Sequence, residues 1–538
     1  MVVTRRIRNL PFKNNLEVYM TTIKGLILGS AAGLLAIGGA QAADLPMKAK
    51  AVEYVKICSL YGAGFYYIPG TDTCIKIGGH IRLDTAIAGN IYDAPQWQGG
   101  ASGAQAWQRD YFATRTRFGL NVDTRTATEY GVLRTYADVK FDWTRGNSGI
   151  AGGAPVEVDY AFIQFAGFTF GKAVSMFDPQ WALSKPTISS GFNAGSNNAT
   201  AIPMLAYTAS FGNGVSATIS LEDAQPYRTA GVVNASSAFI GIGGGSLPGV
   251  SAAGAYGVGN FLGNASGGDH IPDVVGNLRL DQAWGSAYVS AAAHEVHGNY
   301  YTASNADLGR PSSTYGYAAS VGFELKNLPT GAGDSFKMEA TYAKGAAKYV
   351  WGGTIDTAGA GRFLRTSGNG LGSTLAFGYV LDGVYTGTSS ANGSGIDLST
   401  AWDVSAYYEH YWNPAWRTSL FGNYSTISYG AGGNAALIAA LSAGGVTATS
   451  TTAGAGTGFL TVTGGDMKFS TVQIGTRTAW QPVKDLTISA EFIYSRMYTN
   501  LDGTFTNTSA VSGAPAGRVF TLGDQNVYNG AVQLIRSF

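Results

Sequence analysis

Apolar and polar residues alternate along much of this chain, and the charged residues keep to one of the two alternating positions. Between positions 113 and 123, Phe118, Leu120 and Val122 share one parity, whereas Arg115 and Arg117 share the other. A period of two is typical of a β-strand with one apolar and one wetted face. On a helix the same charges would be spread around the axis. The pattern therefore predicts an all-β chain whose strands separate two environments.

The C-terminal segment 527–538 narrows the apolar environment to two possibilities. Val532, Leu534 and Phe538 lie on one face of this expected strand, and the chain ends there. Such a face needs an apolar surround, which is either a protein core or lipid. A secreted soluble β protein is the alternative that the alternation alone leaves open.

The N-terminal region resembles an export signal. In an exported chain with this alternation, lipid is favoured as the apolar surround. An apolar run at 25–39 follows Lys24 and precedes Ala-Gln-Ala at 40–42, the pattern of a secretory signal peptide. We expect that peptide at 20–42, which begins with a methionine, and interpret 1–19 as a mis-annotated start or an extended basic region. No later stretch is an apolar run of transmembrane-helix length, so an integral protein would have to be a barrel.

The composition agrees with a wall between lipid and water. Charged residues make up 13% of the chain, against about 25% in an ordinary soluble protein. Mean hydropathy is +0.04, and the formal net charge is +1. A near-neutral balance gives no sign of nucleic-acid binding.

Sixteen alternating segments are expected to cross the membrane, and an even number is what closure of a bacterial antiparallel barrel requires. They lie near 75–88, 111–124, 130–143, 155–165, 168–174, 203–211, 215–222, 273–283, 286–296, 314–326, 335–345, 401–412, 416–429, 467–480, 486–499 and 527–538. Short turns alternate with long connections at 223–272, 345–400 and 431–466. We place the apolar segment 372–385 in a long loop, because a seventeenth crossing would break this alternation. The parity within 156–165 predicts a β-bulge.

The two cysteines, Cys58 and Cys74, follow the signal and would reach an oxidising compartment. A disulfide between them would stabilise an N-terminal segment, 43–74, by roughly 3 kcal/mol. Two free thiols are the alternative. A zinc site is less favoured, because no histidine or second cysteine pair has ligand spacing. The barrel itself would occupy 75–538.

Several ordered motifs resemble the general porins of alphaproteobacteria. They are Glu53-Tyr-Val-Lys-Ile-Cys58, Tyr61–Cys74, Ile77-Gly-Gly-His-Ile-Arg82, Thr116–Gly131, Tyr160–Gly171, Trp412-Asn-Pro-Ala-Trp-Arg417 and the ending at Phe538. The resemblance implies a sixteen-stranded outer-membrane barrel, usually a homotrimer, in contact with outer-membrane lipid and lipopolysaccharide. It also implies that the barrel-assembly machinery reads Phe538.

In general porins the third outer loop folds into the lumen and narrows it. By strand order that loop here is 175–200, which contains Asp178 and Lys185. We expect it to form the constriction; an ordinary outward loop is the alternative.

Two groups of side chains are predicted to line the pore. The strand residues Arg82, Arg115, Arg117, Arg134, Lys140 and Asp138 share the parity that faces water, and Asp178 and Lys185 lie in the third loop. Opposed rows of charge set a transverse field that biases ion passage. The simpler interpretation is that inward charges only keep the lumen wet.

Passive diffusion of small hydrophilic solutes and ions across an outer membrane is the predicted function. A channel selective for sugars or anions, and a plugged structural or adhesive barrel, are the alternatives. An enzyme is disfavoured, because the five histidines are scattered and no nucleophile turn or phosphate loop is found. We expect no catalytic residue, metal or cofactor.

Overall fold

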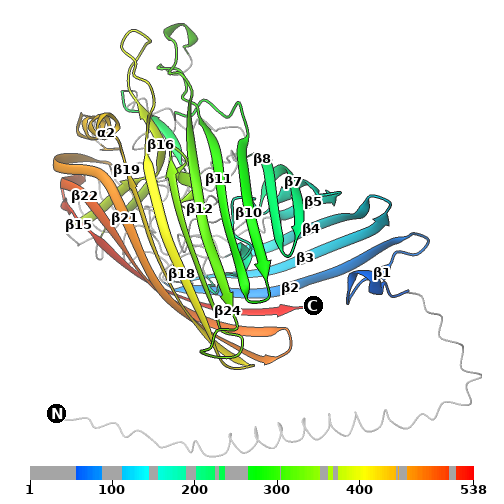
Figure 1. Cartoon of the computed structure of the whole chain (residues 1–538). Coiled ribbons are helices and arrows are strands. Elements are labelled where there is room, and N and C mark those ends of the chain that lie inside the picture. The colour runs from blue at the N-terminus through cyan, green and yellow to red at the C-terminus, as the bar shows by residue number, and fades with distance from the viewer. Residues whose placement is uncertain are drawn as a thin grey trace, which may run out of the picture. The chain divides into compact units, whose positions relative to one another are not determined.

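Sixteen antiparallel strands form a closed barrel in the computed structural model of this chain (Figure 1). The structure describes residues 56–87, 112–144, 156–188, 201–223, 230–236, 265–302, 305–351, 362–366, 374–443, 446–447, 457–507 and 517–538. Of the two compact units in the chain, Ile57–Phe538 contains the barrel. The expected signal peptide at 20–42 and the residues before it lie outside the described part.

Each barrel strand pairs with the next, and the last pairs with the first. The strands are β2 (Thr73–Ile87), β3 (Phe112–Thr128), β4 (Gly131–Thr144), β5 (Val156–Phe165), β6 (Phe168–Ala173), β7 (Ile202–Gly212), β8 (Val215–Glu222), β10 (Asp273–Gln282), β11 (Gly285–Val296), β12 (Thr314–Lys326), β13 (Ser335–Lys344), β18 (Thr400–Asn413), β19 (Trp416–Ser428), β21 (Thr457–Val483), β22 (Leu486–Asn507) and β24 (Gln525–Ser537). Pairing of β24 with β2 closes the wall.

The wall has an apolar outer face and a polar inner face, because side chains alternate across a strand. On β19 Leu420 is 59% exposed, whereas its neighbours Ser419 and Asn423 on the other parity are buried. Val289 on β11 is likewise exposed while Ser290 is buried. The outer face matches hydrocarbon, as the alternation predicted.

The two ends of the barrel differ. We call the end with the short turns the inner end, and the end with the long connections the outer end.

The prediction of sixteen crossings is confirmed. The predicted bulge is present as a register shift between β4 and β5, where Asp159 and Tyr160 are both buried. The segment 372–385 does not cross: β15 (Thr374–Tyr379) and β16 (Leu381–Tyr385) pair outside the wall.

The extents expected for two strands were wrong. β21 and β22 continue well beyond the predicted 467–480 and 486–499, at the outer end. A tilted strand needs only about 9–11 residues to cross. The extra residues therefore belong to a structure outside the membrane.

That structure, which we call the outer cap, is built from the long connections. A three-stranded sheet combines β9 (Gly231–Asn234), β16 and β17 (Asp397–Leu398). The other cap elements are β14 (Arg362–Thr366), β15, β20 (Val446–Thr447), β23 (Val519–Leu522) and the helix α2 (Ala431–Ala443). Tyr379, Leu381 and Leu437 are fully buried in its core. The helix falls where the sequence predicted only a loop.

The short elements complete the description. They are β1 (Tyr66–Tyr67) and the 3₁₀ helices η2 (Ser59–Tyr61), η3 (Ala182–Ser184), η6 (Ala306–Leu308) and η7 (Ala347–Tyr349). Among the described residues, no helix is both long enough and apolar enough to cross a bilayer.

Candidate pore and its lining

A ladder of ion pairs covers the inner face of β2, β3 and β4. Arg115 donates to Asp84 at 2.7 Å, and Arg82 reaches the same carboxylate at 2.7 Å. Arg117 makes a two-point contact with Asp142, each hydrogen bond 2.6 Å long. The strand register explains the pairing, since Asp84 lies opposite Arg115 and Asp142 lies opposite Arg117. Cross-strand neighbours of opposite charge stabilise such a pair of strands.

Lys140 extends this ladder towards β5, where its ammonium pairs with Asp159. The bulge in β5 turns Asp159 inward and so brings the carboxylate to the lysine. Asp138 lies opposite Asn121 and Tyr160 on the same inner face. Four of the predicted cations, Arg82, Arg115, Arg117 and Lys140, therefore lie together, and each is paired with an aspartate.

Arg134 does not belong to this group. It donates to Asp123 at 3.0 Å and to Gln164 at 3.0 Å, and it lies opposite Arg125 in the strand register. Arg125 and Arg117 are eight positions apart on β3, which corresponds to about 26 Å at the rise of an extended strand. Parity alone could not reveal this separation along the barrel.

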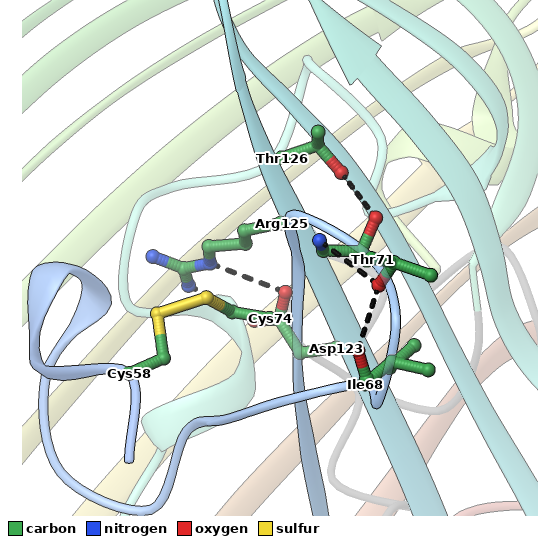
Figure 2. Close-up of a disulfide and its surroundings, with 8 residues drawn as sticks. Cys58, Ile68, Thr71, Cys74, Asp123, Arg125 and Thr126 are labelled. Atoms are coloured by element: carbon green, nitrogen blue, oxygen red, sulfur yellow. Dashed lines mark hydrogen bonds and ion pairs between the residues drawn. A yellow bond between two sulfur atoms is a disulfide. The ribbon is translucent and has the colours of Figure 1, made fainter. Parts of the chain in front are cut away.

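The segment 57–74 packs beside Arg125 at the inner end. The predicted disulfide between Cys58 and Cys74 is confirmed, with Cα atoms 6.1 Å apart. Figure 2 shows this disulfide next to the ion pair of Arg125 and Asp123, which measures 2.9 Å. The Arg125 guanidinium lies 4.9 Å from the centre of the Phe65 ring. The segment is thus attached both covalently and by a cation–π contact.

The connection that follows β6 contacts the far side of the barrel. We call residues 174–188 the crossing segment. Glu222 holds the beginning of this segment. Its carboxylate accepts hydrogen bonds from the Ser175 hydroxyl at 2.7 Å and from the Met176 amide at 2.8 Å. Farther along, the Asp178 carbonyl accepts a hydrogen bond from Arg279 of β10 at 2.6 Å.

The second half of the crossing segment reaches strands still farther round the wall. Lys185 forms an ion pair with Glu339 of β13 at 3.1 Å, and both side chains are almost completely buried. The Pro186 carbonyl accepts a hydrogen bond from Ser419 of β19 at 2.8 Å. Glu339 and Ser419 are both buried and lie on the polar parity of their strands.

A second buried network joins the outer cap to β10 and β11. Asp273 binds His294 at 2.6 Å, Lys348 at 2.9 Å and the Tyr349 hydroxyl at 2.7 Å. On its other side His294 lies 3.5 Å from Asp382. Burial raises the pKa of Tyr349 far above its ordinary value, so this hydroxyl stays protonated and donates. Sequence reasoning missed this network, because its members come from four separate segments.

The C-terminal residue lies against the first barrel strand. Phe538 and Gly79 exchange two backbone hydrogen bonds, of 3.0 and 3.1 Å. The Phe538 ring stacks 6.5 Å from that of Phe118 and stays 60% exposed on the outer face.

One group of possible metal ligands lies away from the pore lining. His270, Glu295 and His297 are close together at the outer end, and this is the one such group found within the described residues.

Comparison with known proteins gives the family and the fold. A family profile described as "Porin subfamily" matches residues 44–530. Porin Omp2b of Brucella canis and that of Brucella melitensis are each 33% identical over 273 residues, which are 49% of this chain and 64% of theirs. The alignment thus spans less than two thirds of these relatives. The outer membrane channel DcaP of Acinetobacter baumannii has a TM-score of 0.50 at 14% identity, covering 88% of this chain and 99% of its own, and shares the fold.

Proposed function

Because this chain belongs to the porin subfamily, we propose that it forms a water-filled channel through which small hydrophilic solutes and ions diffuse passively. It is an integral β-barrel of the bacterial outer membrane. A wall of sixteen strands is wide enough to leave an aqueous lumen. The observation that carries the proposal is the polar inner face of this wall beside an apolar outer face. Transport of this kind needs no catalytic group, and we propose none.

The crossing segment is proposed as the constriction of that channel. It starts at β6 and is held by polar contacts on β10, β13 and β19, so it would occupy part of the cross-section. Asp178 and Lys185 would then lie at the narrowest level. Burial of the ion pair between Lys185 and Glu339 favours a fixed segment, since a partner left alone would be a buried unpaired charge.

Single-channel recording in planar bilayers tests this proposal. We expect ohmic conductance from the full-length protein and a larger conductance after deletion of residues 180–188. The matched control replaces the outward-facing Leu420 by Val, which leaves the interior unchanged. Equal conductance before and after the deletion would mean that the constriction lies elsewhere. Conductance blocked by one sugar would favour a solute-selective channel.

The cations of the ladder, together with Asp138, are proposed to line the pore above the inner end, and Arg134 to line the inner mouth. Every ladder arginine is paired with an aspartate, so the electric field across the pore would be weaker than the number of arginines alone suggests.

Replacing Arg115 by Ser leaves Asp84 with a single cation, Arg82. We therefore expect the reversal potential in a salt gradient to shift towards cations. The double variant D84N/R115S removes one charge of each sign and should restore the parental value; a shift that persists there would reject a role for net charge.

A second candidate function follows from the outer cap. Inward-facing alanines on three neighbouring strands, Ala292, Ala318 and Ala343, pack with Val350 and Trp351 of the cap in one buried cluster. A cap that fills the outer end would make the protein a structural or adhesive barrel instead of an open pore. Absence of conductance from correctly folded protein would favour this candidate.

The assembly is also proposed by analogy with the family. We propose a homotrimer in contact with outer-membrane lipid and lipopolysaccharide, which native mass spectrometry from detergent tests directly. Phe538 is proposed as the residue that the barrel-assembly machinery reads, supported by its exposed ring at the open end of β24. Its deletion should lower the amount of folded protein in the outer membrane, whereas refolding in detergent should be much less affected.

A further inference from the structure

Three metal-binding side chains converge at the outer end of β10 and β11. His270 lies three residues before β10, Glu295 is near the end of β11, and His297 directly follows that strand. One ligand atom from each lies within 4.8 Å of the other two. Glu295 and His297 are buried, whereas the His270 side chain is 56% exposed and opens the group to the exterior.

The Glu295 carboxylate is oriented by the backbone. Its Oε2 accepts hydrogen bonds from the amides of His270 at 2.9 Å and Ile271 at 3.2 Å. Its Oε1 lies 4.0 Å from Nδ1 of His270 and is the oxygen left for a ligand. A buried carboxylate with one oxygen held in this way has little freedom to turn away.

The His297 ring is oriented by a hydroxyl and by the neighbouring chain. Nδ1 of His297 is 2.7 Å from the Ser313 hydroxyl, which leaves Nε2 for a metal. The Gly267 amide donates to the His297 carbonyl at 2.9 Å, and a Cβ at Gly267 would lie 2.8 Å from Nε2. Glycine at this position therefore keeps the space beside Nε2 open. Hydrogen bonds that fix the second ring nitrogen are typical of metal-ligating histidines.

We propose that His270, Glu295 and His297 form a binding site for a transition-metal ion, and that the preferred ion is Zn²⁺. Two imidazoles and one carboxylate, with a fourth position open to water, are a donor set that Zn²⁺ accepts. Ligands at about 2.0–2.1 Å from a tetrahedral ion lie about 3.4 Å from one another. The present spacing needs only a small movement, which the exposed His270 can supply. Softer sulfur ligands are not involved, and Mg²⁺ or Ca²⁺ would prefer oxygen.

Charges of both signs lie near the group. Asp269 and Arg310 both act on His297, with opposite electrostatic signs. The ion would be held by its three ligands. Because the ligands come from the β8–β10 connection and from β11, a bound ion would fasten that connection to the barrel rim. The proposal goes beyond passive diffusion and does not depend on it.

Calorimetric titration of metal-stripped, full-length protein in detergent with ZnCl₂ tests the site. We expect one ion per chain, and at least tenfold weaker binding in H270A and in H297A. Ser313→Ala, which removes a positioning residue, should weaken binding about tenfold while the stoichiometry stays at one. The matched control H410Q removes an imidazole that faces Asp334 at the opposite end and should bind as the parent does.

Two further measurements check that the H270A variant is folded and that the bound ion has the expected ligands. H270A changes a largely exposed side chain, so circular dichroism and heat-modifiable gel migration should show a folded barrel. Titration with Co²⁺ should give the visible absorption of a four-coordinate site with nitrogen and oxygen ligands. No binding at about 100 µM zinc, or equal binding by the parent, H270A and H297A, would overturn the proposal and leave the group as a structural contact between two tilted imidazoles.

Discussion

The barrel wall and the outer cap bury their apolar residues in different ways. In the wall, Leu420 and Val289 point outward and remain exposed on the isolated chain. In the cap, Leu381 and Leu437 are completely buried against each other and against Tyr379. The wall therefore relies on lipid to cover its apolar side, whereas the cap has a core of its own, as a small soluble domain does.

This difference shows that one chain is adapted to two solvents. Strands in the wall keep a period of two, apart from the bulge in β5, because each separates hydrocarbon from polar groups. The cap strand β16 is buried at every position, since it lies between other protein elements. The same apolar segment can thus signal a membrane crossing or a covered core, and only its partners distinguish the two.

The largest expected effect comes from opening a cavity in the cap. Replacing Leu437 by Ala should cost about 2–5 kcal/mol, because the surrounding core cannot close the space. Replacing Leu420 by Ala should cost less, because lipid or detergent tails fill the gap. Hydrogen exchange followed by mass spectrometry should show faster exchange in α2 and β16 of L437A, with the wall unchanged. Equal loss of protection in cap and wall would mean that the two unfold as one unit.

A smaller effect is expected where the wall closes. A Cβ on Gly79 would lie 2.3 Å from the Gly119 carbonyl oxygen and 2.8 Å from the Phe538 ring. Gly79→Ala should therefore strain the junction of β2 with β3 and β24 and cost about 1–3 kcal/mol. The matched control is Gly276→Ala, another strand glycine, whose Cβ would meet no atom closer than 3.8 Å. Urea unfolding followed by tryptophan fluorescence compares the two; equal midpoints would show that the junction can adapt.

The wall could be predicted from sequence because the environment of each side chain is encoded within its own strand. Alternation reports directly on the two environments of each strand, so all sixteen crossings and the bulge near Asp159 were found. The helix α2 was missed, because its glycine- and alanine-rich sequence resembles a loop and its apolar residues find partners only in the folded cap. The predicted extents of β21 and β22 were too short, because their outer residues find partners only in the folded cap.

The candidate pore was predictable only in part. Parity placed Arg82, Arg115 and Arg117 on one face. The register pairs Arg115 and Arg117 with aspartates across the strands, whereas Arg82 reaches Asp84 on its own strand. The position of Arg134 near the inner end depends on distance along a strand, which parity does not report. Contacts such as Lys185 with Glu339 join residues far apart in sequence, and no local pattern encodes them. The proximity of His270, Glu295 and His297 could not be predicted, because His297 lies just past the end of β11, where alternation no longer applies.

The smallest effect is expected at an inner turn, which belongs neither to the lipid-covered wall nor to the cap. Asp334 is buried there and accepts hydrogen bonds from Thr330 at 2.6 Å and from the Tyr411 amide at 2.9 Å, and it binds His410 at 2.8 Å. Burial alone would raise the pKa of Asp334, but these hydrogen bonds hold it well below its ordinary value.

The sign of the pH dependence follows from that lowered pKa. A carboxyl group that is more acidic in the folded state stabilises the fold fully above its unfolded pKa, about 3.9, and this contribution is lost as the pH falls through the folded value. The difference in urea midpoint between the parent and D334N should therefore be fully present at about pH 5 and shrink below about pH 4. D485N, in another inner turn where the side chain is 43% exposed, serves as control and should change the midpoint little at any pH. A parent–D334N difference that stays the same down to about pH 2 would show that shape, and not charge, holds this turn. The inner turns would then resemble the cap, where packing decides stability, more than the ion-paired ladder of the wall.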